Sequence, residues 1–310
     1  MLNVVFCATP DIALPTLQEL HENPHVNLKL VVSKISMKQG RGMKIMAPPV
    51  VQFCKKNNLL FHQTENINKD EFLFDFFKKE EIDILLVFAF SQFLSSKVLA
   101  LPQVGAFNIH TSLLPRWRGA APIQYAILKG DRETGVSLQK MVKKMDAGDV
   151  VLTKTIPLLQ TETTESLTSS LAELSSLLVQ EFITKAVEKS LKYQTQKEED
   201  VTFAPLIQKE EAYLNLEKDS AIEMERKIRA FYPWPAAYCL IEGKRVKVLK
   251  AEMISETQTL TGEPFIETKN QQLLFHCRVG TLRFTEVKPE GKAAMKDTDF
   301  LRGLKHHEKK

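Results

Sequence analysis

The sequence lacks the features that mark membrane, secreted and fibrous proteins. Its longest apolar runs, such as Ile84 to Phe90, are much shorter than the roughly 20 residues that cross a bilayer. The first ten residues have neither the basic start nor the long apolar run of a secretory signal. Glycine and proline number only 12 and 14 among 310 residues, which excludes a collagen-like or low-complexity chain. We therefore expect a globular cytoplasmic protein, and the length predicts two domains.

Cysteine is scarce and its spacing is wide. The four cysteines are Cys7, Cys54, Cys239 and Cys277, and the first two lie within apolar segments. A disulfide framework needs a denser pattern in a smaller secreted chain. We expect four reduced thiols, buried where the surrounding residues are apolar.

Net charge is also low, at +4, but acidic residues are missing from one long stretch. Between Glu22 and Glu65 there is none, while seven lysines and arginines fall there. A solvated basic face would account for such a run. The glycine-containing segment MKQGRGMK, which holds Lys38, Arg41 and Lys44, favours contact with a polyanion, because a mobile basic loop can follow a phosphate backbone.

Alternating strands and helices occupy the first 200 residues. The continuous apolar run at 83–90 predicts a strand buried on both faces, as in a parallel sheet between helices, so the fold class is a doubly wound, Rossmann-like α/β domain. Strands are expected at 2–7, 28–32, 83–90, 105–110, 136–141 and 150–156, and helices at 47–57, 68–79, 122–128, 167–191 and 220–231. After residue 205 short β-rich runs predict a smaller β-barrel or sandwich. The predicted limits are 1–192 for the first domain, 193–205 for a polar linker and 206–310 for the second domain.

Sequence motifs that bind nucleotides or metals are missing. There is no GxGxxG after a strand, no GxxxxGK[ST] phosphate loop, no CxxC or HExxH spacing and no GxSxG nucleophile turn. These absences argue against a dinucleotide enzyme, a P-loop enzyme, a zinc site of the common spacings and an α/β-hydrolase.

The segment at 106–128 carries the most chemistry. Alternation along a strand that ends at His110 puts Asn108 and His110 on one face, at the carboxyl edge where open α/β sheets place their sites. Asp146 lies in an Asp-Ala-Gly-Asp turn between two expected strands. An isolated histidine or a turn aspartate is often only structural, but SLLP, RWR and Gly-Ala-Ala follow His110 directly and resemble the wall of a pocket.

The segment around His110 and several other blocks resemble a known family. HTSLLPRWRGAAPI, with Asn108 two residues before the histidine and MDAGD further on, is similar to the folate-dependent formyltransferases, and within them to the branch that acts on methionyl-tRNA. ATPDIALPTLQEL near the start, MAPPV after the basic loop and IRAFYPWPAAY near residue 230 extend the resemblance over nearly the whole chain.

The resemblance implies an activity, its substrates and the residues that serve it. The formyl group of 10-formyltetrahydrofolate would pass to the α-amino group of methionyl initiator tRNA without a metal, and the C-terminal β-barrel would help to bind the tRNA. We expect a monomer with no membrane contact. The resemblance assigns catalysis to Asn108, His110 and Asp146, folate contact to Ser112, Leu113, Leu114 and Pro115, and tRNA contact to Lys38, Arg41 and Lys44.

The individual catalytic roles stay open on the sequence alone. The Asn108 amide can donate to the oxyanion, and His110 can donate to it or protonate the departing folate nitrogen. Asp146 can orient His110 or accept a proton from the amine. The chain departs from the family pattern at Cys7, Ala8, Ser36, Phe90 and Ser91; Ser91 stands where the family's AYG has glycine.

Three other functions fit parts of the pattern. A sugar-nucleotide N-formyltransferase would share the three catalytic residues, and a formyltetrahydrofolate hydrolase domain would share the catalytic core. A catalytically inactive module that binds tRNA or folate is also conceivable, but the presence of all three catalytic residues argues against it. The basic GRG segment and the IRAFYPWPAAY block favour the tRNA enzyme.

Overall fold

The computed structural model describes residues 1–39, 44–260, 263, 265–268 and 272–307. These residues form two compact units. The first unit comprises Met1–Pro122, Glu133–Pro157 and Thr168–Pro205, and the second comprises Ile123–Arg132, Leu158–Leu167 and the chain from Leu206 onward. The domain limits that the sequence predicts, with a linker at 193–205, stay a prediction.

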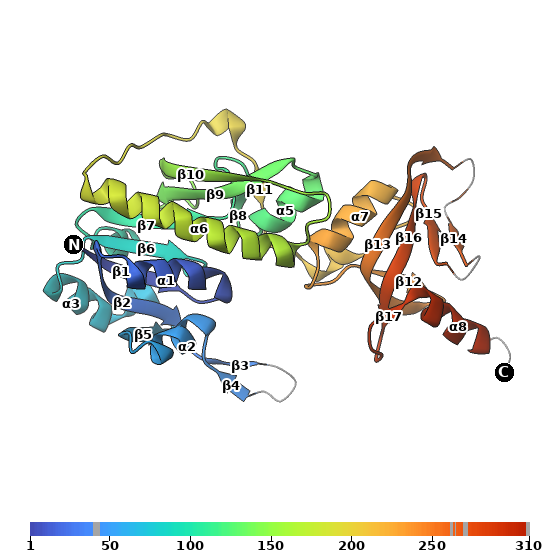
Figure 1. Ribbon diagram of the computed structural model, residues 1–310, viewed down its shortest axis with the longest axis horizontal. Coiled ribbons are helices and arrows are strands. Elements are labelled where there is room, and N and C mark those ends of the chain that lie inside the picture. The colour runs from blue at the N-terminus through green and yellow to red at the C-terminus, as the bar shows by residue number, and fades with distance from the viewer. Residues whose placement is uncertain (40–43, 261–262, 264, 269–271, 308–310) are drawn as a thin grey trace. The chain divides into compact units, whose positions relative to one another are not determined.

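A seven-stranded sheet is the centre of the first unit (Figure 1). Its order is β10-β9-β7-β6-β1-β2-β5. The strands are β1 (Leu2–Ala8), β2 (Val26–Lys34), β5 (Phe61–Thr64), β6 (Ile84–Phe88), β7 (Gly105–His110), β9 (Glu133–Lys140) and β10 (Val150–Pro157). The five strands from β7 to β5 run parallel, while β9 and β10 are antiparallel to their neighbours. The parallel strands therefore place their carboxyl ends along one edge.

Helices pack on both faces of this sheet. On one face, α3 (Glu71–Lys79) and α4 (Ser96–Leu99) contribute Phe77 and Val98 to a cluster that includes Ala106 of β7. On the other face, Phe107 of β7 meets Phe182 of α6 (Thr164–Val187), with ring centroids 4.9 Å apart. The first unit also contains α1 (Leu14–Glu22) and α2 (Pro49–Lys56), whereas α5 (Pro122–Lys129) lies almost entirely in the second unit. All five residues of β6 are buried, as the run at 83–90 predicts for a strand covered on both faces.

The expected elements are present with shifted ends. The helix predicted at 167–191 spans Thr164–Val187, and Lys189 beyond it has a left-handed φ of 54° that stops the helix. The strand predicted from residue 136 begins at Glu133, because pairing with β10 continues to Pro157. The α/β fold class with a second, smaller β unit is confirmed.

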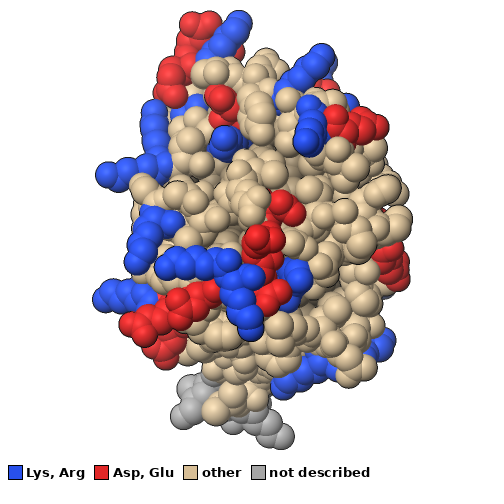
Figure 2. All heavy atoms as spheres, turned by 90° about the vertical axis from the view of Figure 1, so that its left-hand side faces the viewer, with Lys and Arg blue, Asp and Glu red and all other residues tan. Residues whose placement is uncertain are grey.

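A small hairpin replaces part of the expected basic loop. Strands β3 (Met37–Gln39) and β4 (Lys44–Met46) pair antiparallel, with Lys38 opposite Ile45. The predicted tRNA contact Arg41 lies outside the described residues, and for Lys38 and Lys44 only the backbone is described. On the face seen in Figure 2, basic and acidic side chains are interspersed.

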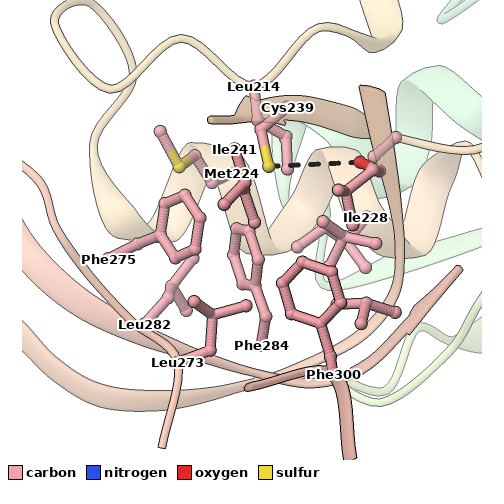
Figure 3. Close-up of a cluster of buried hydrophobic side chains, with 14 of the residues drawn as sticks. Leu214, Met224, Ile228, Cys239, Ile241, Leu273, Phe275, Leu282, Phe284 and Phe300 are labelled. Atoms are coloured by element: carbon pink, nitrogen blue, oxygen red, sulfur yellow. Dashed lines mark hydrogen bonds between the residues drawn. The ribbon is translucent and has the colours of Figure 1, made fainter. Parts of the chain in front are cut away.

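The second unit is built on an antiparallel sheet. Its strands are β12 (Tyr238–Ile241), β13 (Lys244–Thr259), β14 (Phe265–Glu267), β15 (Leu274–His276), β16 (Val279–Pro289) and β17 (Met295–Lys296), in the order β12-β13-β16-β15-β14, with β17 paired to β16. Helix α7 (Ala221–Ala230) packs against β13 and β16. Figure 3 shows the resulting core, in which the rings of Phe275 and Phe284 stack 3.7 Å apart. This unit also contains α8 (Asp297–His307).

All four cysteines are unpaired and buried, as expected. Burial raises the pKa of the Cys54 thiol to about 11 and that of Cys239 to about 12, so both are protonated at neutral pH. Among the described residues, no helix is both long enough and apolar enough to cross a membrane.

One buried ion pair joins the last helix to the second unit's sheet. Asp297, at the start of α8, is 2% exposed and accepts a hydrogen bond of 2.9 Å from Nε of Arg283 on β16. Burial pushes the pKa of this carboxyl upward, but hydrogen bonds from Arg283 and the Thr298 N–H, with the Arg283 charge, outweigh it and leave the pKa below its ordinary value. A depressed folded-state pKa means that the ionised carboxylate stabilises the fold.

We predict that Asp297→Asn lowers the free energy of unfolding by about 2 kcal/mol at pH 7, because hydrogen bonds to a charged group are lost. The stabilisation is complete above the unfolded carboxyl pKa of about 3.9 and is lost as the pH falls through the folded value. Urea unfolding of parent and variant between pH 7 and pH 3 should show the two curves converging at the acid end. A difference in the free energy of unfolding that stays constant over this range would contradict the assignment. The matched control is Asp299→Asn, at an exposed position of the same helix.

Candidate active site

The carboxyl end of β7 carries two polar side chains on one face. Asn108 and His110 alternate with Phe107 and Ile109, which are buried on the opposite face. Neighbouring β6 runs parallel and ends at the same edge. Asn108 is half-buried, and none of the described residues hydrogen-bonds its side-chain amide. The amide is thus open to a group that binds at this edge.

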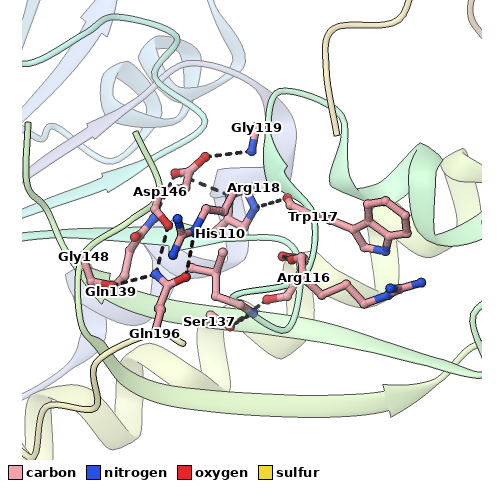
Figure 4. A network of polar contacts seen from close by, with 12 residues as sticks. His110, Arg116, Trp117, Arg118, Gly119, Ser137, Gln139, Asp146, Gly148 and Gln196 are labelled. Carbon is pink, nitrogen blue, oxygen red and sulfur yellow. Dashed lines mark hydrogen bonds and ion pairs between the residues drawn. The ribbon is translucent and has the colours of Figure 1, made fainter. Parts of the chain in front are cut away.

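His110 is buried and has one ring nitrogen committed. Its Nε2 lies 2.8 Å from the carbonyl oxygen of Trp117 (Figure 4). A carbonyl oxygen only accepts, so Nε2 carries the hydrogen and the neutral ring keeps its lone pair on Nδ1. Nδ1 faces Asp146, with 3.8 Å between Nδ1 and Oδ1. That separation is too long for a hydrogen bond.

The turn between β9 and β10 fixes the Asp146 carboxylate. Asp146 has a left-handed φ of 49°, and Gly148 follows where a Cβ would collide with the carbonyl oxygen of Lys140. Oδ2 of Asp146 accepts a 2.9 Å hydrogen bond from the Gly119 N–H, and Oδ1 accepts one of 2.9 Å from Nε2 of Gln139. Both oxygens are therefore held, and the carboxylate is oriented before any substrate arrives.

Gln139 and Ser137 belong to the site although their sequence does not single them out. They face inward on β9, where Gln139 lies opposite Asn108 and Ser137 opposite His110. Opposed residues of adjacent strands put their side chains on one face. One signal in the sequence could have revealed Ser137 and Gln139. They are polar residues that alternate with Val136 and Leu138 in an otherwise buried strand.

Ser137 also anchors the SLLP loop. Its hydroxyl donates to the Ser112 carbonyl oxygen at 2.7 Å and accepts from the Leu114 N–H at 3.0 Å. The Ser112 hydroxyl is buried and donates to the carbonyl oxygen of Arg116 at 2.6 Å. The loop after His110 is therefore shaped from within, and Leu113 and Pro115 are its half-buried members.

A buried arginine completes the network. Arg118, on β8 (Arg118–Gly119), is 2% exposed, donates from Nε to Oε1 of Gln196 at 3.0 Å and pairs through Nη1 with Glu198 at 3.1 Å. The hydrogen bond from Arg118, with that from Lys144, holds the pKa of the exposed Glu198 carboxyl below its ordinary value. The part of the chain predicted to be a linker thus reaches the site.

The structure brings together the three residues expected to act in catalysis. Asn108 and His110 share a strand face, Asp146 faces His110, and the loop of Ser112–Pro115 begins two residues after His110. It does not place Arg41, so the expected tRNA contacts remain a prediction. Among the described residues, no group of three or more His, Cys, Asp or Glu side chains is arranged to hold a metal ion.

Comparison with known proteins matches both units. The family model for Formyl transferase matches residues 2–183, and that for Formyl transferase, C-terminal domain, matches residues 206–305. The methionyl-tRNA formyltransferase of Pediococcus pentosaceus is 33% identical and aligns over 98% of this chain and 95% of its own length. The enzyme of the same name from Methylococcus capsulatus is 37% identical over 97% and 96%. The chain belongs to the methionyl-tRNA formyltransferase family.

Solved structures of low sequence identity share the fold. The N-formyltransferase of Helicobacter canadensis, solved with folinic acid and dTDP-3-aminofucose, aligns with a TM-score of 0.68 at 16% identity, over 92% of this chain and 99% of that one. HypX of Aquifex aeolicus, solved with tetrahydrofolic acid, aligns with a TM-score of 0.61 at 17% identity. The alignment covers 96% of this chain and 46% of HypX.

One departure from the family pattern has a local structural cost. Ser91, in the loop after β6, has a left-handed φ of 57° and is exposed. Glycine adopts this conformation without the steric cost that a Cβ imposes. The glycine of the family's AYG pattern is therefore the residue that this backbone favours.

We predict that Ser91→Gly raises the free energy of unfolding by about 0.5 kcal/mol, because relief of left-handed strain exceeds the entropy that glycine adds to the unfolded chain. Ser95→Gly is the matched control; Ser95 has φ −68°, so the same exchange should be slightly destabilising. Denaturant unfolding of the three proteins decides the matter. Equal shifts in both variants would show that the conformation at Ser91 is unstrained.

Proposed function

We propose that the protein transfers the formyl group of 10-formyltetrahydrofolate to the α-amino group of methionyl initiator tRNA. Two observations support this proposal. Relatives called methionyl-tRNA formyltransferase align over nearly the whole chain, and Asn108, His110 and Asp146 lie together at one sheet edge. The observation that carries the chemistry is the oriented His110–Asp146 pair beside the Asn108 amide, which has no hydrogen-bond partner among the described residues.

Asn108 would stabilise the negative charge that develops on the formyl oxygen. When the amine nitrogen bonds to the formyl carbon, the carbonyl becomes a tetrahedral oxyanion, and a preoriented amide donor lowers the energy of that state. The half-buried Asn108 amide has no described protein partner to give up. Its strand position fixes it relative to His110.

His110 would move the proton at Nδ1. Because its Nε2 hydrogen is bonded to the Trp117 carbonyl oxygen, Nδ1 is the atom that can take the proton released by the amine. Asp146, 3.8 Å away, would stabilise the imidazolium that results. The same Nδ1–H would then supply a proton to the folate nitrogen as the old carbon–nitrogen bond breaks, which balances the transfer.

The folate donor would lie against the loop of Ser112–Pro115. This loop is held by Ser137 and is adjacent in sequence to His110, so its half-buried apolar members could form one wall of a slot. The Ser112 hydroxyl is directed into the loop, and we therefore assign its contribution to loop shape.

The tRNA would be held by both units. Lys38, Arg41 and Lys44 stay our candidates in the first unit. In the second, Lys244 and Arg245 are exposed at the start of β13, and the Arg245 guanidinium lies 3.6 Å from the centre of the Tyr238 ring. Exposed cations that contact phosphates make binding salt-dependent, so the affinity for tRNA should fall steeply as salt is added.

A substrate comparison tests this assignment. The purified protein is incubated with 10-formyltetrahydrofolate and either methionyl initiator tRNA or a dTDP-amino sugar. We expect formyl transfer to the esterified methionine and none to the sugar. Transfer to the sugar alone would establish the sugar-nucleotide activity that the Helicobacter relative suggests, and no transfer to either would contradict the proposal.

We predict that His110→Ala and Asp146→Asn each lower the single-turnover rate by about 100-fold or more, because both groups act on charge that develops during the reaction. The affinity for tRNA should be nearly unchanged. Asp149→Asn, three residues from Asp146 in the same turn, is the matched control and should react at the parental rate. A near-parental rate in the His110 or Asp146 variant would remove that residue from the mechanism.

A further inference from the structure

The polar stretch 193–205 is hydrogen-bonded to the rest of the first unit at both of its ends. Near its start, Gln194 and Val150 of β10 exchange backbone hydrogen bonds of 2.8 and 2.9 Å. Near its end, β11 (Phe203–Ala204) pairs parallel with β8. Gly119 of β8 has a positive φ of 126°, and a Cβ there would collide with the Ala204 carbonyl oxygen. We call residues 194–204 the strap.

Gln196 is the one buried side chain between residues 192 and 200, and its amide joins two chain segments. Nε2 donates to the carbonyl oxygens of Asp146 at 2.9 Å and Gly148 at 2.7 Å, while Oε1 accepts from Nε of Arg118. Asp146 has a left-handed φ, a conformation that costs free energy in a residue with a side chain and needs surrounding support. Gln196 supplies that support on the backbone side of Asp146.

Thr202 holds the partner of the other catalytic residue. Its hydroxyl oxygen accepts a 2.9 Å hydrogen bond from the Trp117 N–H, and its carbonyl oxygen accepts one of 2.9 Å from the Arg118 N–H. Trp117 is also left-handed, with φ 63°, and its carbonyl oxygen receives the Nε2 hydrogen of His110. The strap therefore reaches His110 through one intermediate residue.

We propose that two residues of the strap, Gln196 and Thr202, act as positioning residues for Asp146 and His110. Gln196 hydrogen-bonds the left-handed Asp146, and Thr202 hydrogen-bonds the left-handed Trp117, which contacts His110. Neither positioning residue needs to touch a substrate. A misplacement of about 1 Å in such a group can cost about 100-fold in rate. The proposal rests on the proposed function only for its activity readout.

Two variants remove the hydrogen bonds with little change in shape. Gln196→Glu replaces the donor Nε2 by an oxygen that repels the carbonyls of Asp146 and Gly148, and Thr202→Val removes the acceptor of the Trp117 N–H. Gln194→Glu and Thr195→Val make the same exchanges at exposed strap positions whose side chains have no described partner. Thr202→Ser restores the hydroxyl.

Steady-state formylation is measured at a temperature where every variant is folded, as circular dichroism shows. We expect kcat to fall about 10-fold to 100-fold in Gln196→Glu and Thr202→Val while KM for each substrate stays within about twofold. Thr202→Ser should recover most of kcat, and both controls should match the parent. Parental kcat in the two test variants, or losses that appear in KM instead, would overturn the positioning role.

Hydrogen exchange of the Gly119 amide gives a readout that needs no substrate. This N–H is bonded to Oδ2 of Asp146, so loss of the Gln196 support should speed its exchange at least about tenfold through local opening. Gln194→Glu should leave the exchange rate unchanged. Unchanged exchange in Gln196→Glu would contradict the role of Gln196 even if the parent formylated no tRNA, whereas an inactive parent with faster exchange in the variant would count against the proposed function alone.

Discussion

The hydrogen bond from Nε2 of His110 to the Trp117 carbonyl oxygen determines what the site can do. It fixes the tautomer, which leaves the lone pair of the neutral ring on the nitrogen that faces Asp146. Trp117 lies at the end of a loop that starts at His110 itself, and it has a left-handed conformation. The hydroxyl oxygen of Ser137 accepts a hydrogen bond from the Leu114 N–H within this loop, and that of Thr202 accepts one from the Trp117 N–H at its end.

A second constraint is the mixed seven-stranded sheet, which brings distant parts of the chain to one edge. β7 supplies Asn108 and His110, β9 supplies Ser137 and Gln139, and the turn beyond β9 supplies Asp146. Each strand is buried by apolar residues on the face opposite its polar ones, as with Phe107 against Phe182. Packing of the core thus sets where the strand residues lie, and hydrogen bonds hold the turn of Asp146 and the loop after His110.

Much of the fold and part of the candidate site could be predicted from the sequence. The residues that could not be predicted were missed for physical reasons. Period-two alternation places Asn108 and His110 on one face, and the apolar run before residue 90 indicates a parallel sheet. Asp146 joins them through family resemblance rather than through any local pattern. Gln196 and Thr202 could not be predicted, because they lie in a polar segment without periodicity and their partners are 50 and 85 residues away. A polar segment with no apolar face predicts an exposed linker. This segment is instead held against the site by hydrogen bonds, which leave no apolar pattern in the sequence.

The tautomer of His110 tests the account most directly. In protein labelled with 15N-histidine, the ring signals of His110 are assigned by their absence in His110→Ala, and two-bond couplings show which nitrogen carries the hydrogen. At a pH where the ring is neutral, the account predicts the Nε2–H form, with an unprotonated Nδ1. A neutral ring with its hydrogen on Nδ1 would contradict it, because Nδ1 could then not accept the proton of the amine.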